Sequence, residues 1–254
     1  MRIDLNSDLG EGFGAWSMGD DAAMMEIVST ANIACGFHAG DPQIMRRTID
    51  IARDRKIAVG AHPGYHDLHG FGRRPMPGIS VTEVENLVAY QTGAFAAMCA
   101  LAGHRVTHVK THGALGNACA DDDALADAVA RAIVAVDPGL AFMTMPGTAT
   151  DRAADRHGLR PIREIYADRT YDDSFNLTSR SKPGSMIDDP QLALERTLSM
   201  VGEGRLESVN GKVLKVEIDS ICVHGDRVYI VAMARTLRDG LVKAGWTIGS
   251  KIVN

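Results

Sequence analysis

The sequence contains little cysteine, and its four cysteines lie far from one another. Cys35, Cys99, Cys119 and Cys222 form no Cys-x-x-Cys pair, so the sequence has no cysteine zinc motif and no dithiol redox motif. Isolated cysteines in a reducing compartment act as small buried hydrophobic residues. We therefore expect structural thiols in a cytoplasmic protein.

Long runs of basic residues and long runs of apolar residues are also missing. The net charge is −5 with a pI near 6.0, and no long basic run occurs, so we expect no binding to nucleic acid or to an anionic membrane. No apolar run approaches the roughly 20 residues that a membrane span needs, and the first residues show no apolar signal core. A cytoplasmic location is the expectation.

Nucleotide-binding fingerprints are absent as well. No Gly-x-Gly-x-x-Gly follows the first predicted strand, which argues against a dinucleotide site there. The glycine-rich segment GEGFG at 10–14 lacks the lysine-serine ending of a phosphate-binding loop. The sequence therefore predicts no nucleotide site of its own.

What the sequence does contain is an alternation of strand and helix patterns. Polar linkers are absent, so we predict a single domain over residues 1–254. An Asn-Gly pair within 206–218 predicts a β-hairpin inserted before the last strand. Seven strand–helix units predict an α/β fold, an irregular seven-stranded (β/α) TIM-like barrel, with an open doubly wound sheet as the alternative. The expected strands are 1–11, 30–38, 57–62, 106–112, 141–145, 161–167 and 221–224, and the expected helices are 20–29, 41–52, 80–101, 121–136, 147–157, 190–200 and 229–244.

Proton-handling side chains occur at the ends of these strands. In a barrel enzyme the carboxyl ends of the strands carry the chemistry, so these side chains are candidates for one site. His38 and His62 follow apolar stretches of the same kind, and each could carry a proton or bind a metal. With Asp8 they could supply three metal ligands, but the spacing is no metal motif, and metal content stays open. The predicted catalytic residues are Asp4, Asp8, Glu11, His38, His62, Lys110, His112 and His224.

Other polar residues are candidates for substrate binding. Arg73 lies in a glycine-rich loop, and Arg180 lies before a Pro-Gly pair; both could contact an anion. Asp226 follows the last strand and could orient one tautomer of His224. Asn6 shares the first strand with the predicted catalytic carboxylates. Surface arginines, capping carboxylates and buried ion pairs are the competing structural interpretations of such residues.

Seven motifs along the chain carry a family resemblance. In order they are DLNSDLGE, ANIACGFHAGD, GAHPGYHDLHGFGRR, VKTHGALGN, EIYADRTY, LTSRSKPGSMI and CVHGD. Together they resemble the LamB/YcsF family, described as the A subunit of bacterial ATP-dependent 5-oxoprolinase. The resemblance implies a seven-stranded barrel related to deacetylase and glycoside hydrolase barrels. Two motifs depart from the family pattern. Ser7 stands where cysteine is frequent, and Thr111 and Gly116 stand where the family commonly reads KPHGALYN.

The resemblance also implies a hydrolase activity. The family acts with partner subunits, B and C, to open 5-oxo-L-proline to L-glutamate with ATP, and ATP would bind through or with those partners. A lactam is a stabilised amide, so opening it needs a base for water, an acid for the ring nitrogen and cations for anionic groups. Two alternatives remain open: a stand-alone metal-dependent deacetylase or amidase, and a non-catalytic scaffold subunit.

Overall fold

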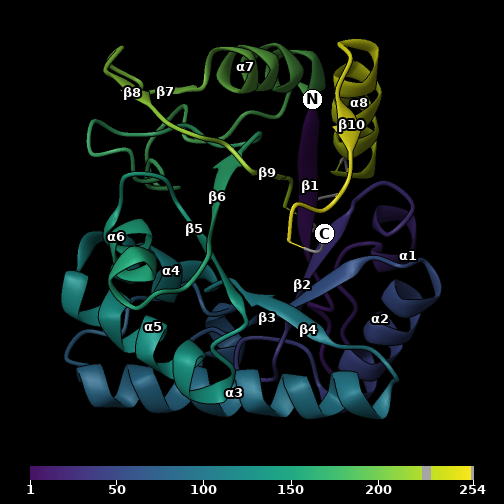
Figure 1. The fold of residues 1–254 in the computed structure, drawn as a ribbon, viewed down its shortest axis with the longest axis vertical. Helices are drawn as coiled ribbons and strands as arrows, with labels where there is room; N and C mark the ends of the chain where they lie inside the picture. The colour runs from purple at the N-terminus through teal and green to yellow at the C-terminus, as the bar shows by residue number, and fades with distance from the viewer. Residues whose placement is uncertain (225–229, 253–254) are drawn as a thin grey trace.

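Seven parallel strands close into a barrel in the computed structural model, which describes residues 1–224 and 230–252 (Figure 1). The strands follow chain order around the barrel, and β9 pairs with both β6 and β1, which closes the sheet. This closure confirms the predicted barrel and excludes the open sheet. The strands are β1 (Arg2–Leu9), β2 (Thr30–Ala34), β3 (Ala58–His62), β4 (Val106–Val109), β5 (Ala141–Thr144), β6 (Pro161–Tyr166) and β9 (Ser220–Cys222).

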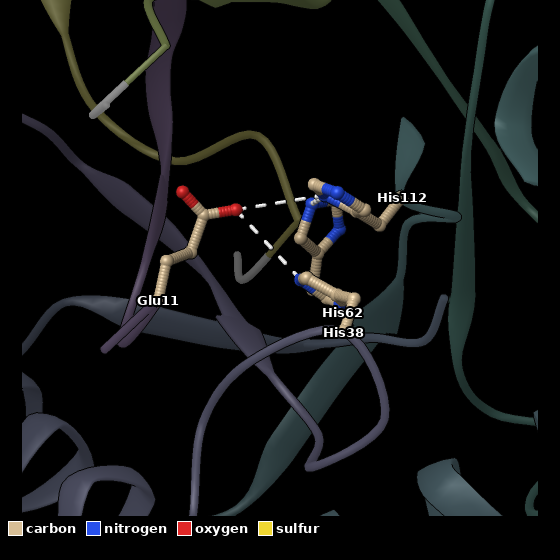
Figure 2. A group of neighbouring side chains, drawn as sticks. All are labelled: Glu11, His38, His62 and His112. Carbon is tan, nitrogen blue, oxygen red and sulfur yellow. Dashed lines mark hydrogen bonds and ion pairs between the residues drawn. The ribbon is translucent and has the colours of Figure 1, made fainter. Parts of the chain in front are cut away.

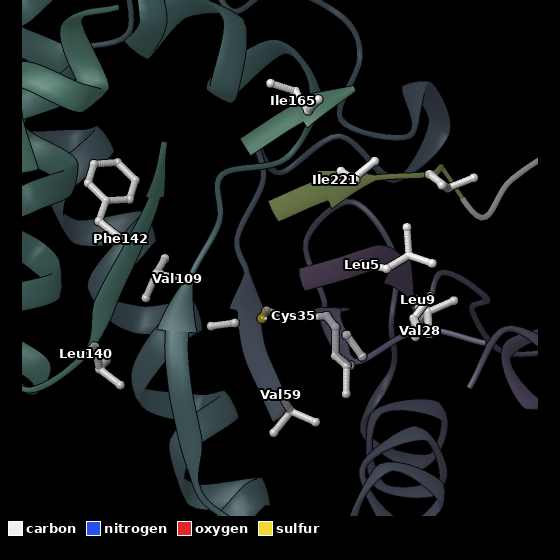
Figure 3. Packing of buried hydrophobic residues seen from close by; sticks show 14 of the residues in the cluster. Leu5, Leu9, Val28, Cys35, Val59, Val109, Leu140, Phe142, Ile165 and Ile221 are labelled. Atoms are coloured by element: carbon white, nitrogen blue, oxygen red, sulfur yellow. Dashed lines mark hydrogen bonds between the residues drawn. The ribbon is translucent and has the colours of Figure 1, made fainter. Parts of the chain in front are cut away.

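Alternate residues of the strands face two different environments. The apolar set, which includes Leu5, Val59 and Ile165, joins the main hydrophobic core outside the barrel (Figure 3). Because successive side chains of a strand point to opposite faces, the other set points into the barrel. Here that inner set is largely polar: Asn6 of β1 donates a hydrogen bond to Ser220 of β9, and Asn32 of β2 donates one to Asn6. The barrel interior is therefore a network of hydrogen bonds.

Helices cover the outside of the barrel. Helix α2 packs on β2 and β3, α3 on β3 and β4, and α6 on β5 and β6, while α3 runs along the lower edge of Figure 1. Asp41 caps α2 with Pro42 in its first turn, and Ser80 and Glu83 form a reciprocal cap on α3. The helices are α1 (Asp21–Met24), α2 (Pro42–Asp54), α3 (Val81–Leu101), α4 (Gly113–Asp121), α5 (Asp123–Val136), α6 (Ala149–Arg156), α7 (Pro190–Glu203) and α8 (Ile230–Lys243), with a 3-10 turn η1 (Leu68–Gly70).

One predicted helix is shorter than expected, and one helix was missed. The predicted helix 20–29 is only the four-residue α1, because the chain has to reach β2, where the Ser29 amide donates to the Leu5 carbonyl. Helix α4 was not predicted. It begins just after β4, and its glycine and alanine content hid the short apolar face of Leu115 and Cys119 that holds it against the core.

Two small sheet elements lie outside this pattern. β7 (Arg205–Glu207) and β8 (Val213–Lys215) form an antiparallel hairpin within the segment where the sequence suggested one. β10 (Thr247–Ile248) pairs with the first residues of β1. In the described ranges, every helix is too short or too polar to cross a bilayer.

Candidate active site

A cavity of about 980 Å³ opens at the carboxyl ends of the strands. This is the rim at which the sequence placed its candidates. The residues that line it include Asp8, His62, Arg73, Lys110, His112, Glu164, Tyr166, Arg169, Arg180 and His224.

At one side of the cavity lie four residues that we call the histidine cluster: Glu11, His38, His62 and His112. Of these, His62 and His112 line the cavity. His62 is the last residue of β3, and the other three lie in the segments that follow β1, β2 and β4. Figure 2 shows the glutamate facing the three imidazole rings. Glu11 Oε1 lies 3.8 Å from His38 Nε2 and 3.5 Å from His112 Nδ1. The His38 ring stacks on His112 with centroids 3.7 Å apart.

Backbone carbonyls fix the orientation of two of these rings. His62 Nδ1 lies 2.8 Å from the Lys110 carbonyl, and His112 Nε2 lies 2.8 Å from the Phe71 carbonyl, so both nitrogens must donate a proton. In the neutral rings the opposite nitrogens then carry lone pairs. These two nitrogens, His62 Nε2 and His112 Nδ1, face each other at 3.0 Å. Two lone pairs at that distance need a proton or a cation between them.

The histidine cluster has the composition of a divalent metal site. Within residues 1–224 and 230–252, neither ring nitrogen of His38 has a hydrogen-bond partner, although the ring is fully buried. Burial lowers the pKa of both His38 and His112 well below the ordinary value, and the neighbouring rings lower it further, so both rings are neutral. Neutral imidazole is the form that binds metal, and metal-binding histidines commonly donate their other N–H to a carbonyl. A proton on His62 Nε2 would give a hydrogen bond to His112 Nδ1 only. A metal ion could be bound by the lone pairs of all three histidines and by Glu11.

Next to this cluster lies a buried ion-pair network. Lys110 Nζ lies 2.8 Å from both Asp8 Oδ1 and Glu164 Oε1, and His62 Nε2 lies 3.3 Å from Asp8 Oδ2. Burial would raise the pKa of Asp8, but the charges of His62 and Lys110 hold it well below its usual value. Burial would lower the pKa of Lys110, but the two carboxylates hold it well above its usual value. Asp8 is therefore ionised and Lys110 is charged.

The polar interior of the barrel holds Asp8 from below. Asn32 Nδ2 donates to Asp8 Oδ1 at 2.8 Å, and its oxygen lies 2.7 Å from His108 Nε2. Burial lowers the pKa of His108 to about 3, so this ring is neutral. Gly60 makes room for it, because a Cβ at Gly60 would lie 2.2 Å from His108 Nε2. The glycine and the imidazole together fix the amide that orients Asp8.

Another histidine, His224, lies at the rim where β9 ends, next to the end of β6. His224 Nδ1 lies 2.9 Å from Asp168 Oδ2, so it donates to that carboxylate and leaves Nε2 with a lone pair in the neutral ring. The ring stacks on Tyr166 with centroids 5.3 Å apart. Burial would raise the pKa of Asp168, but His224 lowers it below its usual value. This histidine–aspartate pair is built to accept or deliver a proton.

The structure does not bring all predicted site residues to the cavity. Asp4 and Asn6 point into the barrel, and neither lines the cavity in the described part of the chain, because both precede Asp8 along β1 and lie deeper. We therefore withdraw contact with substrate as their role. Asp226 lies outside the described residues. Asp8, His62, Lys110, His112, His224, Arg73 and Arg180 line the cavity, while Glu11 and His38 complete the histidine cluster beside it.

Several residues of the site were missed from sequence. Glu164 and Asp168 belong to the segment EIYADRTY, where alternate residues from 164 onward are polar or aromatic. That alternation was the available signal, and it extends past the end of β6 to the rim. Arg169, in the same segment, lines the cavity with only 5% of its surface exposed.

Comparison with known proteins identifies the family. The family model described as the LamB/YcsF family matches residues 3–252. The A subunit of 5-oxoprolinase from Rhodopseudomonas palustris is 54% identical over 98% of this chain and 98% of its own length. The crystal structure of the lactam utilization protein from Thermus thermophilus is 42% identical and superimposes with a TM-score of 0.92, covering 98% of this chain and 100% of that one.

A more distant similarity concerns the fold alone. The catalytic domain of a peptidoglycan N-acetylglucosamine deacetylase from Eubacterium rectale superimposes with a TM-score of 0.51 at 9% identity, covering 98% of this chain and 87% of that one. The barrel is thus shared with deacetylases. The match over nearly the whole length, with relatives at 54% identity, shows that this chain belongs to the LamB/YcsF family.

Proposed function

We propose that this chain is the ring-opening component of an ATP-dependent 5-oxoprolinase, which converts 5-oxo-L-proline to L-glutamate. One observation carries the proposal: the barrel rim gathers an ionised carboxylate, a charged lysine and a histidine–aspartate pair at one cavity, with the histidine cluster beside them. The relative from Rhodopseudomonas palustris is named as the A subunit of 5-oxoprolinase, and the neighbour from Thermus thermophilus is named a lactam utilization protein.

The reaction adds water across the ring amide. The oxygen of water bonds to the carbonyl carbon, the ring C–N bond breaks, and the ring nitrogen takes up protons to become the amino group of glutamate. In our proposal Asp8 takes the proton from water, because it is ionised and lies at the cavity wall. His224, oriented by Asp168, delivers a proton to the ring nitrogen from its protonated form: Nε2 gives up its proton and keeps the lone pair, and solvent restores the proton after turnover. Lys110 holds Asp8 in its charged state.

A divalent metal fits this site. Glu11, His38, His62 and His112 would hold it, through the carboxylate oxygen and the ring nitrogens that converge in the histidine cluster. A bound divalent ion supplies Lewis-acid polarisation of a carbonyl and lowers the pKa of bound water. Asp8 touches His62 and thus stands beside the cluster.

Partner subunits would supply the ATP chemistry. The sequence lacks the fingerprints of a phosphate loop or a dinucleotide site, so we propose that subunits B and C bind ATP and activate the lactam. In this activation the γ-phosphoryl group passes to the lactam oxygen and ADP leaves; after water has opened the ring, a second water releases the group as phosphate. Arg73 and Arg180 line the cavity and would face an anionic, activated substrate. We further propose that the assembly works in the cytoplasm, where the four buried cysteines of this chain stay reduced.

Reconstitution tests the proposal. Glutamate release from 5-oxoproline and ATP is measured with this chain alone, with the partner subunits alone, and with all subunits together. We expect release only from the complete assembly. Equal release from the partners alone would show that this chain does not open the ring.

One observation favours a second candidate function. The histidine cluster and the barrel shared with deacetylases would also suit a stand-alone metal-dependent amidase or deacetylase. Release of acetate from N-acetylated sugars by the zinc-loaded chain, without ATP or partners, would favour that candidate.

A further inference from the structure

Arg169 is a buried cation on the cavity wall. Only 5% of its surface is exposed, and it follows the end of β6 by three residues. Within residues 1–224 and 230–252 its guanidinium forms no ion pair with a carboxylate. Its Nε donates to the Ser185 carbonyl at 3.2 Å, and its Nη2 donates to the Thr178 carbonyl at 2.6 Å.

Other buried charges at the rim have partners of opposite charge. Lys110 has Asp8 and Glu164. Asp168 precedes Arg169 in the chain, but both of its carboxylate oxygens bond His224 Nδ1, at 3.0 and 2.9 Å. The Asp168 charge still acts on Arg169 from a distance and opposes the burial that lowers its pKa. No carboxylate of the described residues, however, bonds the guanidinium directly, and a buried charge with so little direct compensation is costly. A ligand that brings a carboxylate to the guanidinium would supply that contact.

The free donors of Arg169 suit a planar anion. A guanidinium carries five N–H donors in a fixed fork, and the Nη1 group of Arg169 has no acceptor among the described residues. Such a fork binds a carboxylate through two parallel hydrogen bonds. Arg73 adds positive charge nearby: burial lowers the pKa of both Arg169 and His38, and the Arg73 charge lowers both further. Arg73 therefore lies within electrostatic reach of both Arg169 and the histidine cluster.

The backbone holds Arg169 rigidly in this position. Arg196 donates to the Arg169 carbonyl at 3.1 Å, and the Ile187 amide donates to the Asp168 carbonyl at 2.9 Å. The segment that receives the guanidinium, from Thr178 to Ser185, is itself joined to the strand end, because the Thr178 amide donates to the Thr170 carbonyl. A cation fixed in this way loses little conformational freedom when it binds a ligand.

We infer that Arg169 binds the carboxylate of the lactam substrate and so selects 5-oxoproline over lactams that lack this group. The inference rests on the proposed function for the identity of the ring. It adds a residue that the sequence did not indicate. The carboxylate on Arg169 anchors the ring in the cavity that Asp8 and His224 also line.

Calorimetric binding of two probes to the purified full-length chain tests this role. The probes are 5-oxo-L-proline and 2-pyrrolidinone, which is the same ring without the carboxylate. We expect the wild-type chain to bind 5-oxoproline about 10- to 100-fold more tightly than 2-pyrrolidinone, as one charge-assisted contact provides. Arg169→Gln should bind both probes equally weakly. Lys182→Gln, which removes an exposed positive charge from the same cavity wall, should keep the wild-type preference.

Arg169→Lys guards against a folding defect in the glutamine variant. It keeps the charge but loses the fork, so its preference should fall between those of the wild type and the glutamine variant. A full preference in a folded Arg169→Gln variant, or equal binding of both probes by the wild type, would overturn the inference. A wild-type preference that disappears in Arg169→Gln, together with no glutamate release from the complete assembly, would sustain the carboxylate site and reject the proposed reaction.

Discussion

Asp4 and Asp8 lie on the same strand and the same face of it, yet they have opposite properties. Asp4 is surrounded by hydroxyl groups: Ser29 and Thr30 donate to its Oδ1, and Ser220 donates to its Oδ2. Burial raises its pKa above the usual value. Asp8 contacts a lysine and a histidine, and its pKa is held well below the usual value. Both carboxyls are buried, so the charged partners of Asp8, which Asp4 lacks, account for the opposite directions of the two pKa shifts.

A chain of hydrogen bonds joins the two carboxylates. Asn32 donates to Asp8 and to Asn6, Asn6 donates to Ser220, and Ser220 donates to Asp4. This series of hydrogen bonds thus has a carboxylate acceptor at each end. One end opens to the cavity beside Lys110, and the other is closed off within the barrel. The comparison teaches that spacing on a strand predicts a shared face, whereas the cross-strand partners determine the chemistry.

The same substitution at both positions gives the largest expected contrast. Asp8→Asn should lower glutamate release by the complete assembly about 100- to 10,000-fold, because positioned proton transfer contributes that much. Asp4→Asn should stay within about tenfold of the wild type, since Asp4 lies away from the cavity. Thermal melting checks that both variants fold. Equal losses in two folded variants would break the comparison.

Removing the lysine tests why Asp8 is ionised. Lys110→Met should lower the free energy of unfolding by about 3–5 kcal/mol, because it leaves Asp8 and Glu164 buried without a counterion. Urea denaturation measures the change. The exposed Lys215→Met variant is the matched control and should stay within about 0.5 kcal/mol of the wild type. A loss at Lys110 no larger than that of the control would contradict the buried network.

The histidine cluster borders Asp8 and not Asp4. Whether this cluster binds a metal ion can be tested by measuring the zinc content of variants. We expect His38→Ala to weaken binding of zinc by at least about 100-fold, because loss of a ligand costs more than loss of a supporting residue. Elemental analysis after dialysis, and the rise in melting temperature on adding zinc, report binding without any turnover. His224→Ala should keep the zinc of the wild type. Stoichiometric zinc in His38→Ala would remove His38 from the metal site.

The smallest expected effect concerns the pH dependence of stability. Because burial raises the folded-state pKa of Asp4 above 3.8, the folded state binds this proton more tightly than the unfolded chain. The resulting stabilisation is present at low pH and is lost as pH rises through the folded pKa. Asp4→Asn has no such carboxyl group to titrate. Its free energy of unfolding, relative to that of the wild type, should therefore increase as the pH rises from about 4 through the folded-state pKa of Asp4. Urea titrations at several pH values measure it.

An exposed acid provides the control for that experiment. Asp155→Asn should show a nearly constant difference from the wild type over the same range, since Asp155 is exposed. A flat profile for Asp4→Asn as well would show that its carboxyl is not held by burial.

The sequence predicted strand ends better than partners across the barrel. His62 and Lys110 were correctly expected at the rim, because an apolar strand followed by a polar residue is a local pattern. The ion pair between Lys110 and Glu164 joins strands 54 residues apart, and no local pattern encodes it. Asp4 was expected beside Asp8 from a local pattern as well. The two-residue repeat of a strand shows which residues share a face, but it does not show how deep in the barrel each one lies.

Helix prediction failed where tertiary contacts decided the outcome. The short α1 is limited by the return to β2, and α4 depends on core contacts of Leu115 and Cys119. Arg169 was missed because an arginine in a loop usually points to solvent, and only the path of 178–185 around it makes it buried. All three depend on contacts between residues that are distant in the sequence, and the periodicity of a strand or helix does not predict such contacts.

The pairing of β1 with β9 sets a condition on biosynthesis. Residues Asp4, Leu5 and Asn6 find their partners only at Ser220, Ile221 and Cys222. At about 5–20 residues per second on the ribosome, β1 waits on the order of 10–40 s for that strand. During this interval the nascent sheet has open edges at β1 and at its growing end, and such edges template pairing with other chains. Yield in recombinant expression should therefore respond to translation speed and chaperone supply over the last third of the message.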